Sequence, residues 1–111
     1  MTMWIQVTGS IAVATVVVSQ GLAAGNVTAG RQKALMCQTC HGLDGKAKIA
    51  EAPNLAGQSE IYLVKALKDY RSGARKNDMM SLVAPTLKGN DIDDLAAFYA
   101  AIECTAAPPP K

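Results

Sequence analysis

Two cysteines and the only histidine of this 111-residue chain lie within five consecutive positions. The segment Cys37-Gln38-Thr39-Cys40-His41 has the C-x-x-C-H spacing that is typical of covalent attachment of a c-type haem. Two thiols three positions apart can reach the two vinyl groups of one porphyrin edge and form thioethers. The imidazole that follows is then carried under the ring, where it can bind the iron. The motif therefore predicts one haem c, anchored by Cys37 and Cys40 and ligated by His41.

Two other kinds of cysteine site fit the sequence less well. A redox pair of the thioredoxin type needs a βαβ context, and the sequence shows almost no strand pattern. A zinc site needs four ligands, usually in two spaced pairs. Here Cys104 is the only further thiol, and there is no second histidine. With both motif cysteines bound to haem, Cys104 has no partner within the chain. It is therefore expected to be either a partly buried inert thiol or a disulfide link to a second chain.

The methionines are candidates for the opposite face of the haem. Iron in an electron carrier needs a sixth ligand, and a methionine opposite the histidine raises the reduction potential. Of the five methionines, Met1 and Met3 lie in the N-terminal segment, and Met36 is too close to the attachment motif to cross the ring. This elimination leaves Met79 and Met80 and does not choose between them.

Length and composition exclude several classes of protein. A chain of 111 residues forms one domain at most. Eleven Lys plus Arg against nine Asp plus Glu give a net charge of +2, too balanced for a nucleic-acid binder. Half of the residues are hydrophobic but only 5% are aromatic, so a cofactor is expected to fill much of the interior. No general base or nucleophile constellation is visible, which argues against an enzyme.

The N-terminal segment has the pattern of an export signal. Residues 1–24 carry no charged side chain, and an apolar run over 11–18 is followed by Ala23 and Ala24. Such a run before small residues is typical of a secretory signal peptide, and it is shorter than the roughly 20 residues that span a membrane. We therefore expect residues 1–24 to be removed and the mature protein to be periplasmic. An uncleaved anchor is the alternative, because no Lys or Arg precedes the run.

Three helices are expected to position the chemical groups. The first is predicted from Thr28, as its N-cap, to Gln38. The second opens at the N-cap Ser59 and ends at Gly73. The third follows the cap Asn90 and carries three aspartates in its first turns, where we expect them to act as capping residues alone.

The remaining stretches complete the expected domain, which covers residues 25–104. The long segments 42–58 and 74–89 are expected to be irregular and to wrap a cofactor or carry a site. The tail 105–111 contains three consecutive prolines and is expected to be disordered.

The chain resembles a class I cytochrome c, in particular one haem domain of the dihaem cytochromes of bacterial periplasms. The resemblance covers about residues 30–102. Beyond the attachment motif and Gly42, it rests on an ordered set of segments: Asp44-Gly45, Pro53-Asn54-Leu55-Ala56-Gly57-Gln58, Tyr62-Leu63, Gly73-Ala74-Arg75, Asn77-Asp78-Met79-Met80, Asp91-Ile92 and Leu95-Ala96-Ala97-Phe98-Tyr99. It implies an all-α fold of three to five helices wrapped around one covalently attached haem. Since only one C-x-x-C-H is present, the protein is expected to be monohaem.

The resemblance also implies roles for single residues. The carbonyl of Pro53 would accept a hydrogen bond from the free imidazole nitrogen of His41, which orients the ligand and makes it more basic. In related domains the axial methionine lies seven residues before the leucine that precedes the last helix. That leucine is Leu87 here, so the resemblance selects Met80. Tyr62 and Arg75 would be partners of the haem propionates; the alternative is that these two side chains are solvated surface residues. The first and last helices would cross closely at Gly30 and either Phe98 or Tyr99.

The implied function is electron transfer. We expect a periplasmic carrier that shuttles one electron between redox partner proteins and has no small-molecule substrate and no nucleic-acid partner. One alternative is a dedicated cytochrome c subunit of a periplasmic dehydrogenase or oxidase. Another is a gas-binding or peroxidatic haem protein, which would need an open iron position. Basic residues could form patches that steer acidic partners, although interspersed aspartates favour ordinary solvation.

Overall fold

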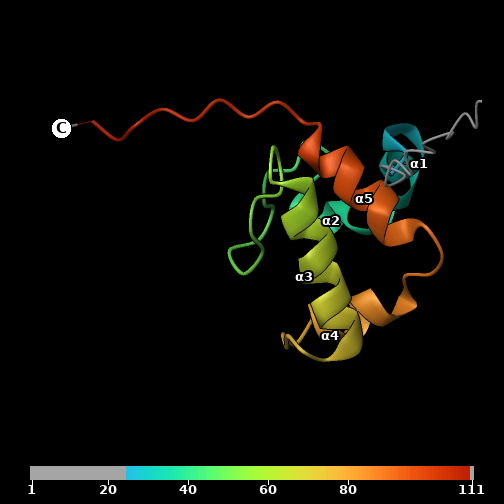
Figure 1. Ribbon diagram of the computed structural model, residues 1–111. Coiled ribbons are helices and arrows are strands. Elements are labelled where there is room, and N and C mark those ends of the chain that lie inside the picture. The colour runs from blue at the N-terminus through green and yellow to red at the C-terminus, as the bar shows by residue number, and fades with distance from the viewer. Residues whose placement is uncertain (1–24, 111) are drawn as a thin grey trace, which may run out of the picture.

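The computed structural model describes residues 25–110, and the expected signal segment lies outside them. The described part contains α-helices and 3₁₀ turns and no strand, which confirms the all-α fold. In chain order (Figure 1) the elements are α1 (Val27–Lys33), a 3₁₀ turn (Ala34–Met36), α2 (Gln38–His41), α3 (Glu60–Ser72), α4 (Met80–Val83), a 3₁₀ turn (Ala84–Thr86) and α5 (Asp91–Ala100). None of the helices in residues 25–110 has the length and hydropathy needed to cross a membrane.

Helix α5 is the centre of the molecule and lies between α1 and α3 (Figure 1). It is buried over most of its surface, and the core forms around it from apolar side chains of several elements: Ala34, Leu63, Leu87, Ile92, Leu95, Ala96, Phe98 and Tyr99. The attachment motif adjoins this core, since Cys37 packs against the cluster.

The crossing of α1 and α5 depends on a glycine. A Cβ added to Gly30 would lie 2.0 Å from the carbonyl oxygen of Asp94 and 2.7 Å from the Cβ of Phe98. Only a residue without a side chain allows the two backbones to approach this closely. The expected contact of Gly30 with the last helix is therefore confirmed, with Phe98 as its partner.

The start and end of α1 differ from the prediction. The N-cap is Asn26 and not Thr28, because the Asn26 side chain accepts a hydrogen bond from the N–H of Ala29 at 2.8 Å. Asn and Thr are both good N-caps, so local preference could not decide between them. The helix ends at Lys33 and continues as a 3₁₀ turn, so the segment 28–38 is not one helix.

The ends of α3 were predicted correctly. The Ser59 hydroxyl accepts from the N–H of Tyr62 at 3.5 Å, and Gly73 ends the helix with a φ of 85°. Asn90 occupies the N-cap position of α5, but its side chain makes no capping hydrogen bond.

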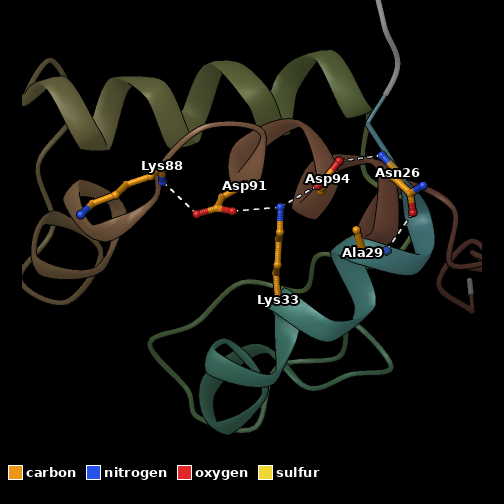
Figure 2. Close-up of polar contacts among 6 residues, drawn as sticks. All are labelled: Asn26, Ala29, Lys33, Lys88, Asp91 and Asp94. Atoms are coloured by element: carbon orange, nitrogen blue, oxygen red, sulfur yellow. Dashed lines mark hydrogen bonds and ion pairs between the residues drawn. The ribbon is translucent and has the colours of Figure 1, made fainter.

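The aspartates of α5 do more than cap it (Figure 2). The Nζ of Lys33 lies 2.9 Å from Asp91 and 2.6 Å from Asp94, and Asp94 also accepts from the N–H of Asn26 at 2.7 Å. Asp91 in turn accepts from the N–H of Lys88 at 2.8 Å. These bonds lower the pKa of both carboxyl groups and raise the pKa of Lys33. The expectation of capping alone was therefore wrong, because two of the carboxylates fasten α1 to α5.

The second irregular segment also differs from its prediction. Residues 74–89 contain α4 and the second 3₁₀ turn, and α4 lies beside the C-terminal end of α3 (Figure 1). A helix of four residues is too short to leave a periodic pattern in the sequence. The segment 42–58 has no helix, as expected.

Candidate functional site

A single helical turn carries the attachment motif. Cys37 lies at the N-cap position of α2 and His41 is its last residue, with the His41 N–H donating to the Cys37 carbonyl at 2.9 Å. Residues three and four apart on a helix share one face, so the turn gathers two thiols and an imidazole. Cys37 and Cys40 are half-buried with free thiols, and His41 is only 7% exposed.

The orientation of His41 is fixed by a backbone carbonyl. Its Nδ1 lies 3.0 Å from the carbonyl oxygen of Pro53, the contact that the resemblance implied. A carbonyl can only accept, so Nδ1 carries the hydrogen and donates it. The proton-free Nε2 of this tautomer is then available to bind a metal.

The segment after His41 is held by a side chain that the sequence did not identify. The Tyr99 hydroxyl donates to the carbonyl oxygen of Gly42 at 3.2 Å, and Tyr99 is only 3% exposed. Burial raises the pKa of Tyr99, so the hydroxyl stays protonated and remains a donor. The available signal was a tyrosine on the apolar face of the last helix, because a buried tyrosine hydroxyl needs a partner.

The surroundings of the Cys37 thiol differ from those of a catalytic redox cysteine. Burial, followed by the proximity of Cys40, raises its pKa to about 11. Reactive C-x-x-C pairs have lowered thiol pKa values. The environment of Cys37 thus disfavours the thioredoxin-type alternative.

The two candidate methionines differ in exposure. Met79 is 58% exposed, whereas Met80, the first residue of α4, is partly buried. The sequence could not separate these neighbours from the residues alone. Their exposure favours Met80 as the side chain withdrawn towards the interior.

The two expected propionate partners bind one another. The Arg75 guanidinium donates to the Tyr62 hydroxyl at 3.2 Å and lies 4.8 Å over the ring of Tyr70. The bond to Tyr62 is the main cause of the raised pKa of Arg75. The arginine is thus charged and fixed against α3, with further N–H donors left over.

Cys104 is exposed and lies beyond the end of α5. The expected partial burial of its thiol was therefore wrong.

The predicted site residues accordingly occupy three places. The first place holds Cys37, Cys40, His41 and Pro53. The second holds Tyr62 and Arg75, and the third is the start of α4, where Met80 lies. Two free thiols and an imidazole with an available nitrogen on one turn are the donor set that a c-type haem requires. The residues present therefore fit this cofactor.

Comparison with known proteins agrees with this donor set. The family described as Cytochrome c matches residues 27–101. Cytochrome c-554(548) of Halomonas halodenitrificans is 42% identical over 83 residues, which are 72% of this chain and 100% of that protein. The thiosulfate dehydrogenase electron acceptor of Stutzerimonas stutzeri is 41% identical over 70 residues, which are 62% of this chain and 32% of that protein.

A solved structure has the same fold. Reduced recombinant cytochrome c4 from Pseudomonas stutzeri superposes with a TM-score of 0.65 and 36% identity, over 70% of this chain and 46% of that one. The chain thus spans the whole of the first relative but less than half of the other two proteins. The name of the second relative describes that protein as an electron acceptor of thiosulfate dehydrogenase. The chain belongs to the cytochrome c family, as a class I haem domain that binds haem c covalently through Cys37 and Cys40.

Proposed function

We propose that this chain is a single-haem electron carrier with His41 and Met80 as the axial ligands. The observation that carries the proposal is the hydrogen bond from His41 Nδ1 to Pro53, which leaves Nε2 available on the same turn as two free thiols. When bound, the haem iron supplies a one-electron Fe(II)/Fe(III) couple. Cys37 and Cys40 would then hold the ring, His41 and Met80 would supply the iron ligands, and the burial of His41 would keep water from it.

Tyr62 and Arg75 are proposed to bind the haem propionates. One guanidinium N–H is used by Tyr62, and the remaining donors can pair with a carboxylate. An Arg75→Lys variant would keep the charge and lose the fork-shaped donor set, whereas Arg75→Ala would lose both. A reduction potential that shifts in Arg75→Ala and less in Arg75→Lys supports the contact. An unchanged potential in both variants supports a purely solvated arginine.

We propose that the partners are redox proteins with acidic surfaces. Three exposed cations that the proposed propionate contact does not use lie between residues 68 and 76, namely Lys68, Arg71 and Lys76. Asp69 within that stretch is already paired with Lys65. Two haem propionates would bring the net charge of +2 near zero, so steering is expected to be weak. Association rates should therefore fall only modestly as ionic strength rises.

The location is proposed to be the periplasm, with export directed by residues 1–24. The apolar run and the small residues after it support this proposal. Mass spectrometry of the exported protein tests it, since a mature N-terminus just after Ala23 or Ala24 is expected. A retained N-terminus would favour the anchored alternative.

A second candidate is a dedicated electron acceptor of a dehydrogenase. One relative bears the name thiosulfate dehydrogenase electron acceptor, which is the observation that favours this function. A dedicated acceptor should co-purify with one dehydrogenase and exchange electrons with it much faster than with other redox proteins. A free carrier should show no such preference.

Optical spectra of the exported protein test the proposal. We expect a c-type reduced spectrum, a methionine–iron charge-transfer band in the oxidised state, and no shift when carbon monoxide is added to the reduced state. Met80→Ala should lose the band, lower the potential and bind carbon monoxide, whereas the matched control Met79→Ala should do none of these. If neither variant changes the spectrum, the methionine assignment is wrong. If the unmodified protein readily binds carbon monoxide, the gas-binding function replaces electron transfer.

A further inference from the structure

One asparagine side chain holds the backbone of both candidate methionines. The Oδ1 of Asn77 accepts from the N–H of Met79 and from the N–H of Met80, each at 3.0 Å. The backbone N–H of Asn77 donates to the Ser81 hydroxyl at 2.9 Å, and the N–H of Ser81 donates to the Asn77 carbonyl at 2.9 Å. These four bonds close a turn around residues 77–81, which we call the Asn77 clasp.

The two methionines held by the clasp differ in their exposure to solvent. Within it, Met79 is 58% exposed and Met80 is partly buried at the start of α4. Neighbouring residues in a turn point in different directions, so a shift of the backbone by one position would exchange their places. The two side chains offer the iron the same sulfur ligand, so the choice between them must come from the backbone that carries them.

We propose that Asn77 is a positioning residue that selects Met80 over Met79 as the axial ligand. This inference rests on the proposed methionine ligation and adds how the ligand is chosen. Asn77 acts through the two backbone N–H groups and touches neither sulfur in this role. Ser81 supports it from the other side of the turn.

The test uses proton NMR of the reduced holoprotein and imidazole binding to the oxidised holoprotein. A ligand methionine lies over the ring current of the porphyrin, so its methyl protons give a strongly upfield signal. The unmodified protein should show one such signal, assigned to Met80 by its loss in Met80→Ala. Asn77→Ala should show a second set of upfield methyl signals, which come from Met79. Imidazole should bind to this variant about five times more tightly, which is the effect expected for the loss of one capping acceptor.

Three matched variants separate positioning from general stability. Asn77→Asp keeps an acceptor for both N–H groups and should restore the single signal. Met79→Leu should leave the signal unchanged by itself and should abolish the second set when combined with Asn77→Ala. Ser81→Ala should show the Met79 signals at a lower population than Asn77→Ala does, and Ser81→Thr should not show them. The Ser81 pair also decides the question if Asn77→Ala does not accumulate as a folded holoprotein.

The outcomes distinguish this inference from the proposed function. If Met80→Ala keeps the upfield methyl signal and Met79→Leu abolishes it, the proposed ligation itself is wrong. If Met80→Ala loses the signal while Asn77→Ala, or the Ser81→Ala fallback, shows one methionine set and unchanged imidazole affinity, only the positioning role is wrong. A Met79 signal that appears in Asn77→Ala and is absent in Asn77→Asp supports the role.

Discussion

The segment that contains the attachment motif and the segment that contains Met80 are held by different kinds of contact. On the histidine side, which comprises residues 37–42, His41 is nearly inaccessible, and the buried hydroxyl of Tyr99 in α5 donates to the Gly42 carbonyl. On the methionine side, residues 73–86, the hydrogen bonds of Asn77 and Arg75 are all exposed. Water can replace an exposed bond, whereas breaking a buried one leaves an unsatisfied group. The histidine side should therefore be rigid, and the methionine side should be where ligands exchange.

Substitutions of two glycines should show the largest difference in stability between the two sides. Gly30→Ala places a methyl group 2.0 Å from a backbone oxygen of α5, behind the histidine side, and should destabilise the protein by about 3 kcal/mol or more. Gly73→Ala, at the start of the methionine side, has nothing within 4 Å and loses only its positive-φ conformation, worth about 1 kcal/mol. Denaturant unfolding of the two holoproteins measures the difference. Equal losses would contradict a close crossing of α1 and α5.

Two tyrosine substitutions compare the hydrogen bonds of the two sides. Tyr99→Phe removes the buried hydroxyl that donates to the Gly42 carbonyl, which keeps only the 3.3 Å bond from the Gly45 N–H, and should cost about 1 kcal/mol of unfolding free energy. Tyr62→Phe removes a hydroxyl from a side chain that is 47% exposed and should change stability by less than about 0.5 kcal/mol. Chemical denaturation of both variants provides the measurement. A Tyr62→Phe loss as large as that of Tyr99→Phe would mean that the two sides are equally rigid.

The Lys33–Asp94 contact should make the α1–α5 scaffold sensitive to acid. The hydrogen bond from Lys33, and then that from the Asn26 N–H, hold the pKa of Asp94 below its unfolded value of about 3.9. The ionised carboxylate therefore stabilises the fold above pH of about 4, and this contribution is lost as the pH falls through the folded pKa. Asp94→Asn should lower the melting temperature at pH 7, and the difference from the unmodified protein should shrink below pH of about 4.

Lys33→Met provides the matched control for this pH dependence. It removes the charged partner of Asp94 and leaves the bond from the Asn26 N–H, so Asp94→Asn should cause a smaller further loss in that background than in the unmodified protein. A melting-temperature difference that is the same at pH 7 and at acid pH would show that the Asp94 charge is not what joins the helices.

Short-range features were predictable from the sequence. The C-x-x-C-H spacing placed the two thiols and the imidazole, because one helical turn is enough to bring them together. Ser59 and Gly73 marked the ends of α3 through preferences that act within a few residues.

Long-range contacts decided what the sequence could not. Asn26 became the cap of α1 partly because its N–H bonds to Asp94, 68 positions away. The contact between Tyr99 and the Gly42 carbonyl joins residues 57 positions apart and leaves no local pattern. The choice between Met79 and Met80 rests on a family spacing, and the bonds from both backbone N–H groups to Asn77 Oδ1 are the structural reason that we propose for it.

Cys104 should give the smallest effect, because it belongs to neither ligand side. Its side chain is exposed beyond the end of α5, so Cys104→Ser should leave the reduction potential unchanged and alter stability by less than about 0.5 kcal/mol. An exposed thiol is also free to pair with a second chain. Non-reducing electrophoresis of the mature protein decides between the two states, since a disulfide would give a larger band that disappears in Cys104→Ser. A single monomeric band in the unmodified protein would exclude a linked partner and leave Cys104 as an inert surface thiol.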